Sequence, residues 1–148
     1  MKLPLSWLKD YTNIDGISPA EFDAAMTMSG SKVECVDYLG AEINNVVTGK
    51  ILSVEKHPDS DHLVICQIDA GQDEPVQIVT GAPNVTENSI GEICPVCLHK
   101  STLPGGVKIT RGKLRGVMSN GMMCSFQELG LEHGCVPYAC DNGILFLP

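Results

Sequence analysis

The sequence predicts a mainly β protein, built as a small barrel of short strands behind a small N-terminal α/β segment. Runs of β-branched residues recur between residues 46 and 117, and each run is bounded by turn-forming residues. The 15 glycines and 9 prolines among 148 residues suit a turn-rich β protein better than a helical bundle. Aromatic residues make up only 5% of the chain, so aliphatic side chains must fill the core.

The N-terminal segment carries the signals of one clear helix. Ser18 and Glu21 form a capping box, with Pro19 at the first helical position, and Gly30 is placed to end the helix. A shorter helical turn is expected before it, ending near Tyr11. A strand is expected after it, over residues 33–39.

Residues 1–41 are too few to bury Trp7 and Phe22 by themselves. We therefore expect this α/β segment to be completed by chain that lies downstream. The last residues, 143–148, form an apolar run with no polar tail, which likewise indicates a fragment of a longer protein.

The barrel is expected over residues 42–148. Short strands at this spacing, separated by turns, are typical of small closed sheets. A second capping box, Ser125 with Glu128, predicts a short helix that Gly130 ends. The expected strands cover residues 46–54, 63–68, 76–79, 90–98, 107–109 and 114–117.

Composition indicates a cytoplasmic protein with no membrane partner. No apolar run approaches the roughly 18 residues that span a bilayer, and the N-terminus does not read as a signal peptide. Seven cysteines, an odd number at irregular spacings, favour reduced thiols over a disulfide framework.

Positive charge is concentrated in one stretch of a chain whose formal net charge is −8. No Asp or Glu occurs between Glu92 and Glu128, and we call the cations in this interval the basic segment. A glycine-flanked basic loop on a small barrel suits a phosphate backbone, whereas the alternative is a solvated hairpin that only aids solubility. The basic segment consists of Lys100, Lys108, Arg111, Lys113 and Arg115.

Two further clusters have metal-like spacing but lack a full ligand set. Cys94 and Cys97 could belong to a zinc or redox motif, yet a closed zinc site needs four ligands and no suitable second pair follows. Residues this far apart on a strand point to opposite faces, so core thiols are the favoured interpretation. His57 and His62 flank Pro-Asp-Ser-Asp, which is also the composition of a turn. No metal ligand and no catalytic residue is predicted.

Three sequence blocks together resemble the tRNA-binding domain of the oligonucleotide-binding (OB) barrel superfamily. They are KHPDSDHL at residues 56–63, QIVTGAPNV at 77–85 and LRGVMSNGMMCS at 114–125. The opening MKLPLSWLKDY and the stretch LPGGVKI at 103–109 resemble bacterial phenylalanine–tRNA ligase β subunits.

This resemblance implies part of an aminoacyl-tRNA synthetase that serves protein biosynthesis. It implies an α2β2 ligase whose aminoacylation site lies on the α subunit, so the expected partners are tRNA and the ligase α subunit. ATP and magnesium are expected for the assembled enzyme, while this chain holds no cofactor and no active site of its own.

The basic segment and the family blocks supply the candidate tRNA-binding residues. Residues 39–125 contain no Phe, Tyr or Trp, so stacking on aromatic rings is not available there, and recognition must rest on phosphate contacts and shape. The rival interpretations are a free-standing tRNA-binding or RNA-chaperone module, an interaction platform with little RNA contact, and a zinc module. The candidates are Lys108, Arg111, Lys113 and Arg115 for phosphates, with Lys56, Asn84 and Ser119 as polar members of the family blocks.

Overall fold

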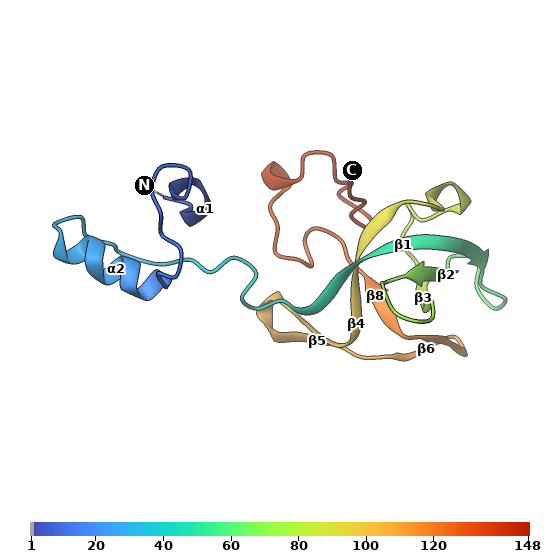
Figure 1. Cartoon of the computed structure of the whole chain (residues 1–148). Coiled ribbons are helices and arrows are strands. Elements are labelled where there is room, and N and C mark those ends of the chain that lie inside the picture. The colour runs from blue at the N-terminus through green and yellow to red at the C-terminus, as the bar shows by residue number, and fades with distance from the viewer. Residues whose placement is uncertain (1) are drawn as a thin grey trace. The chain divides into compact units, whose positions relative to one another are not determined.

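The computed structural model describes residues 2–148 and divides into two compact units. The first unit ends at Leu39, and the second runs from Gly40 to Pro148 (Figure 1). Among the described residues, no helix is long and apolar enough to cross a membrane.

The N-terminal unit contains two helices, α1 (Leu5–Leu8) and α2 (Pro19–Met28). The capping box is formed, because the Ser18 hydroxyl accepts from the Glu21 N–H at 3.3 Å and the Glu21 carboxylate accepts from the Ser18 N–H at 2.9 Å. Gly30 follows the helix with φ 101°, a conformation that suits glycine. The predicted start and end of this helix are confirmed.

The strand predicted over residues 33–39 is wrong, because the structure has no strand there. A strand over residues 33–39 would need a partner strand, and residues 2–39 contain none. Without a partner, its backbone N–H and C=O groups would be left unpaired. Ile14 is the only buried residue among 2–39, while Trp7, Tyr11 and Met28 are largely exposed. The helices of this unit thus bury very little apolar surface.

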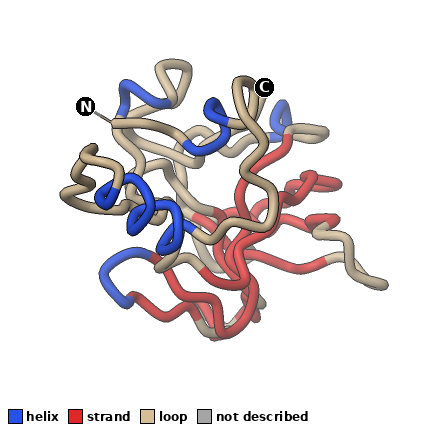
Figure 2. Tube along the Cα trace, turned by 60° about the vertical axis from the view of Figure 1, so that its left-hand side comes forward, coloured by secondary structure: helices blue, strands red, loops and turns tan. Residues whose placement is uncertain are grey.

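The second unit is a curled antiparallel sheet, as Figure 2 shows in red. Its order is β3-β2-β1-β4-β5, with β8 also paired to β4, and β6 and β7 form a separate hairpin. This is a mainly β, OB-like architecture, as predicted. The strands are β1 (Asn44–Lys56), β2 (Val64–Asp69), β3 (Val76–Thr80), β4 (Ile93–Leu103), β5 (Val107–Ile109), β6 (Gly112–Leu114), β7 (Val117–Ser119) and β8 (Gly121–Met123). Three 3₁₀ turns complete the unit, η1 (Glu87–Ser89), η2 (Pro104–Gly106) and η3 (His133–Cys135).

Strand β1 is the centre of the sheet because it pairs with two neighbours. Its first half pairs with β4 and its second half with β2, and the two sets of pairs meet at Lys50. A Cβ on Gly49 would lie 2.6 Å from Ile68 Cγ2 and 2.8 Å from Val96 Cγ2. Only glycine lets β2 and β4 approach each other this closely at the bend.

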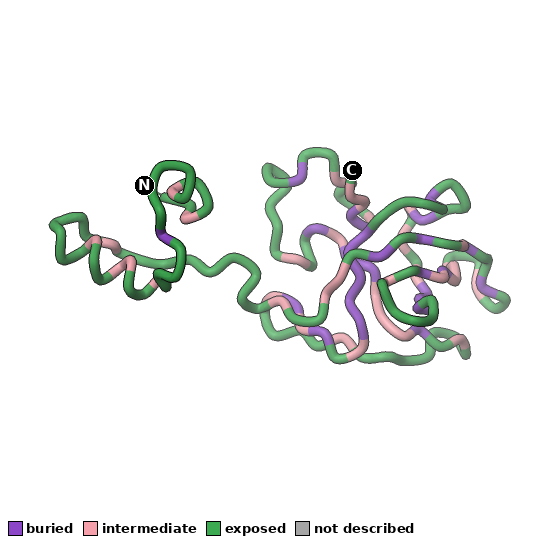
Figure 3. Tube along the Cα trace, viewed as in Figure 1, coloured by how far each residue is buried: buried purple, intermediate pink, exposed green. Residues whose placement is uncertain are grey.

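The main core lies inside this curl. Buried positions, purple in Figure 3, are concentrated in the strands of the second unit. Aliphatic and sulfur-containing side chains fill the cluster, as the low aromatic content requires. It includes Ile51, Ile68, Ile78, Val96 and Met123, all at or near zero exposure.

Two parts of the second unit differ from the sequence-based expectation. The single strand expected over residues 114–117 is a hairpin, because Arg115 and Gly116, with φ 45° and 88°, form a two-residue turn between β6 and β7. Positive φ at both central residues matches the right-handed twist of the flanking strands. The capping box from Ser125 to Glu128 forms, but a turn stands there in place of the expected helix.

A C-terminal segment packs against the barrel through its own small apolar cluster. Phe126, Val136 and Leu145 are buried together. The side-chain amide of Asn84 joins the barrel to this segment, since it donates to the Ile144 carbonyl at 2.8 Å and accepts from the Ile144 N–H at 2.9 Å.

Substitution of Gly121 by alanine should destabilise the barrel. A Cβ at this position would overlap the Cys97 carbonyl oxygen, a backbone atom in the paired strand β4. We expect the free energy of unfolding to fall by about 1–3 kcal/mol, measured by urea denaturation. Gly112→Ala is the matched control, because a Cβ there has no neighbour within 4 Å. Equal denaturation midpoints for the two variants would contradict this packing.

Candidate nucleic-acid interface

All five cations of the basic segment lie on the surface of the second unit. Each is exposed, and none makes an ion pair with any residue among 2–148. Strands β5 and β6, which carry Lys108 and Lys113, follow one another along one edge of the barrel (Figure 1). The five cations are therefore exposed on the second unit and have no ion-pair partner among the described residues.

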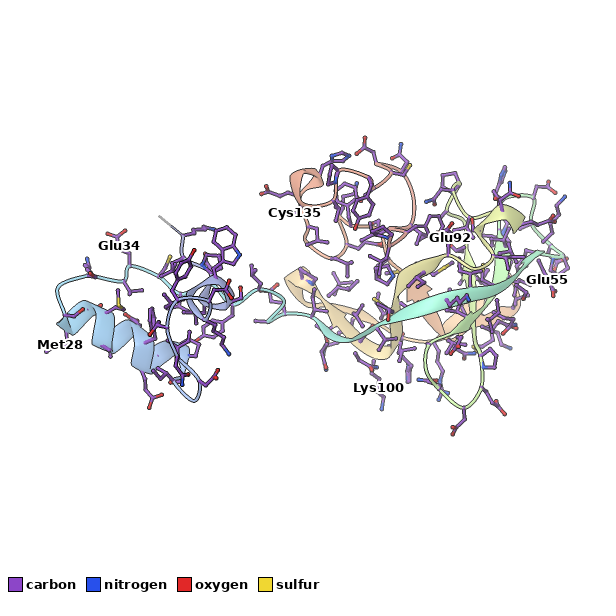
Figure 4. The ribbon with its side chains drawn as sticks, turned by 45° about the horizontal axis from the view of Figure 1, so that its top comes forward. Met28, Glu34, Glu55, Glu92, Lys100 and Cys135 are labelled. Atoms are coloured by element: carbon purple, nitrogen blue, oxygen red, sulfur yellow. The ribbon has the colours of Figure 1, made fainter. Side chains whose placement is uncertain are left out.

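A bulge in β4 positions the first of these cations. Residues Val46 and Asn44 of β1 pair with Cys97 and Thr102, so the chain between them leaves the ladder. Within this bulge Lys100 has φ 68°, and Figure 4 shows it on the opposite side of the β1 ribbon from Glu92. Lys100 therefore lies near the end of β4, whereas Glu92 comes directly before the strand begins.

His99, to which the sequence analysis gave no role, joins the bulge to Arg111. Its carbonyl accepts from Asn45 Nδ2 at 3.0 Å, and its Nδ1 accepts from the Arg111 N–H at 3.2 Å. The backbone at Arg111 is therefore fixed next to the bulge that carries Lys100.

The hairpin presents Lys113 outward by strand alternation. Lys113 pairs with Met118, and both are exposed, whereas the next pair along, Gly112 with Ser119, includes a buried serine. Successive side chains on a strand point to opposite faces. Because Ser119 points inward, Lys113 and Met118 point toward solvent.

His57 holds the turn of the first family block against the tip of the hairpin. The residue is only 4% exposed, its Nδ1 accepts from the Asp59 N–H at 3.0 Å, and its Nε2 lies 3.1 Å from the Leu114 carbonyl oxygen. These contacts require the tautomer in which Nε2 carries the proton and donates it to Leu114. Arg115 Nη1 adds a 3.2 Å bond to the Asp59 carbonyl. This region is a turn, as favoured over a metal site in the sequence analysis.

Ser119 closes the barrel between the second and third family blocks. Its hydroxyl accepts from the Val79 N–H at 3.0 Å and donates to the Gly121 carbonyl at 2.9 Å, and the residue is 3% exposed. Gln77 strengthens the same closure by donating from Nε2 to the Met118 carbonyl at 2.7 Å. Ser119 was expected among the tRNA contacts, and the geometry instead gives it a role inside the fold.

Asn84 and Lys56 are the other two candidates from the family blocks, and they differ in whether their polar atoms are already bonded within the fold. Both the oxygen and the nitrogen of the Asn84 side-chain amide are hydrogen-bonded to the backbone of Ile144, as described above. Lys56, at the end of β1, is exposed beside the His57 turn and makes no ion pair within residues 2–148. Of these two, Lys56 alone has a free side chain to offer a ligand.

The cysteines of the Cys-x-x-Cys stretch lie in separate apolar clusters. Cys94 belongs to the main core and Cys97 to a second cluster with Leu103 and Cys124, and all three cysteines are fully buried. Within residues 2–148, no group of three or more His, Cys, Asp or Glu side chains is arranged to hold a metal ion. Cys94 and Cys97 therefore point into different apolar clusters, as the core-thiol interpretation expects.

This arrangement suits the backbone of a folded nucleic acid. Lysine and arginine side chains bind phosphates and release counterions, and they need no partner residue to do so. Gly105 and Gly106, with φ 78° and 76°, turn the chain between β4 and β5, and the Gly105 N–H donates to the Glu42 carboxylate at 3.0 Å.

Comparison with known proteins gives relatives along the whole chain. The phenylalanine--tRNA ligase beta subunit of Clostridium acetobutylicum is 60% identical over 131 residues, which cover 88% of this chain and 16% of that protein. The subunit of the same name from Clostridium tetani is 53% identical over 148 residues, covering 100% of this chain and 18% of that protein. The chain therefore spans less than a fifth of the length of these curated relatives.

Among solved structures, the C-terminal domain of Plasmodium vivax p43 aligns with 56% of this chain and 46% of that chain. The TM-score is 0.46 and the sequence identity 25%, so the fold assignment rests on the strand topology given above.

The family described as putative tRNA binding domain matches residues 46–138. The match begins in β1, extends past β8 and includes His57, Ser119 and the complete basic segment. The chain therefore belongs to the putative tRNA binding domain family.

Proposed function

We propose that this chain is a tRNA-binding part of a phenylalanine–tRNA ligase β subunit. Its role would be to hold tRNA during the ATP-dependent attachment of phenylalanine. The observation that carries the proposal is the exposed and unpaired basic segment, in a chain whose net charge is −8. Surplus cations on one surface of an acidic protein suit a polyanionic partner.

The proposed interface consists of cations that can reach a phosphate. Ser119 and Asn84 are left out of it, because their polar atoms are used within the fold. Binding would rest on phosphate contacts and on the shape of the RNA, since residues 39–125 offer no aromatic ring for stacking. The proposed contacts are Lys108, Arg111, Lys113, Arg115 and Lys56.

The chemistry of the assembled enzyme would lie outside this chain. None of its residues is assigned to the ATP and magnesium that the family resemblance implies for the assembled enzyme. We place the aminoacylation site on the α subunit of an α2β2 ligase in the cytoplasm, as the family resemblance implies.

The N-terminal unit is proposed to pack against another part of the longer subunit. Trp7, Tyr11 and Met28 are exposed by 68%, 88% and 87%, and the ten-residue helix α2 buries none of its residues. Apolar side chains left this open favour a covering partner. The relatives have ample further chain, because these 148 residues match only 18% of the Clostridium tetani protein.

Charge reversal in the hairpin should weaken tRNA binding in a salt-dependent way. With three or four phosphate contacts, the logarithm of the association constant should fall with the logarithm of salt concentration at a slope of about −2 to −4. Lys113→Glu/Arg115→Glu should lower the magnitude of that slope by about one to two and reduce affinity at every salt concentration. Fluorescence anisotropy of labelled tRNA over a salt series measures both quantities.

Lys32→Glu/Lys50→Glu is the matched control, because it changes net charge equally at two exposed lysines outside the basic segment. Equal losses for the two double variants would show that only net charge matters. Absence of binding by the unmodified chain at low salt would favour the interaction platform over a tRNA-binding surface.

Two variants of His57 should separate its two hydrogen bonds. His57→Asn keeps an acceptor near the Asp59 N–H but cannot reach the Leu114 carbonyl, whereas His57→Gln keeps the longer reach. We expect His57→Asn to lower tRNA affinity about two- to tenfold, the worth of one hydrogen bond, and His57→Gln to lower it less.

The loss in affinity should arise through Arg115, which bonds to the same turn. His57→Asn should therefore cost little when added to Arg115→Ala. Fully additive losses in this double-mutant cycle would contradict a coupling between the two residues.

A further inference from the structure

Two buried thiols meet at the base of the basic segment. Cys97 Sγ in β4 lies 2.8 Å from Cys124 Sγ, which follows β8, and both residues have zero exposure. Val96 pairs with Met123, and the Cys124 N–H donates to the Pro95 carbonyl at 3.0 Å. Cys124 thus lies opposite Pro95, on the face that Cys97 shares, so the strand register itself brings the two sulfurs together.

The pair lies beneath a thin layer of side chains. Leu103 is the third fully enclosed member of the cluster, and the residues packed around it, Val46, Ile109, Met122 and Leu129, are only partly buried. Small motions of these side chains would admit a small molecule to the sulfurs, since short strands such as the three-residue β8 open locally.

The surroundings distinguish Cys97 from the other buried cysteines. A hydrogen bond from the Cys124 thiol lowers the pKa of Cys97, whereas burial raises the pKa of Cys66 to about 11 and that of Cys94 to about 12. The thiolate is the reactive form of cysteine, so Cys97 is the best nucleophile among these three. Within residues 2–148, Cys97 and Cys124 are also the only cysteines whose sulfurs are joined by a hydrogen bond.

We propose that Cys97 and Cys124 form a modification site, at which a peroxide converts the two thiols to a reversible disulfide. The Cys97 thiolate attacks one oxygen of hydrogen peroxide, which gives a sulfenic acid and releases hydroxide. The Cys124 sulfur then attacks the sulfenic sulfur, so that the S–S bond forms and a second hydroxide leaves. The two thiol protons convert both hydroxides to water, and the thiols lose two electrons to the peroxide. An external dithiol reverses the reaction by exchange.

A disulfide at this site would enclose the whole basic segment in one covalent loop. The segment between Cys97 and Cys124 contains every cation of the basic segment and all of β5, β6, β7 and β8. A disulfide would close this segment into a covalent loop, which restricts the unfolded chain and stabilises the fold. Oxidation should therefore raise the melting temperature by several degrees.

Peptide mapping of the native chain tests the proposal directly. After hydrogen peroxide treatment and blocking of free thiols, cleavage after Lys, Arg and Glu isolates residues 93–100 and 116–128, and the second peptide contains Cys124 as its only cysteine. The expected product is these two peptides linked, lighter than their sum by two hydrogens and separated again by dithiothreitol. The oxidised chain should also melt several degrees higher.

Cys94→Ala and Cys97→Ala are a matched pair of controls, because both residues are fully buried in β4 and share one peptide. The linkage should survive Cys94→Ala and disappear in Cys97→Ala. Three results would overturn the proposal: recovery of Cys97 and Cys124 unlinked, linkage that forms only in denaturant, or a fall in melting temperature on oxidation. None of these outcomes depends on whether the chain binds tRNA.

Discussion

The curled sheet of the second unit is possible because strand β1 pairs with both β4 and β2. One strand of 13 residues pairs with β4 along its first half and with β2 along its second half. The sheet can curl at this point because Gly49 leaves room for Ile68 and Val96 on either side. The curl encloses the aliphatic core, and the end of β4 pairs through its other edge with β5, which carries Lys108 of the basic segment.

The same curl brings together family blocks that are far apart in the sequence. His57 from the first block meets Leu114 from the third, and Gln77 from the second meets Met118. These bonds hold the hairpin near its tip and at the middle of β7, so the backbone that carries Lys113 is fixed. A fixed backbone loses little freedom when a polyanion binds, which favours binding.

Local signals were enough to predict the helix α2, the turn at residues 57–61 and most of the barrel strands, because capping residues and β-branched runs act over a few positions. Local signals failed where a strand forms only if another strand is there to pair with it. Residues 33–39 have strand-like composition but no strand to pair with among residues 2–39, and β8 was missed because its three residues are ordered by β4. The exposed cations could be named from charge alone. By contrast, the roles of Ser119, Asn84 and His57 depend on contacts 40 to 60 residues away in the chain.

A tRNA bound as proposed would cover the basic segment. The most direct measurement is the rate at which each lysine reacts with an acetylating reagent, with and without tRNA, read by mass spectrometry. Lys108 and Lys113 should become protected, while Lys32 and Lys50, exposed lysines outside the segment, should keep their rates. Protection of Lys32 or Lys50 with no change at Lys108 and Lys113 would contradict it.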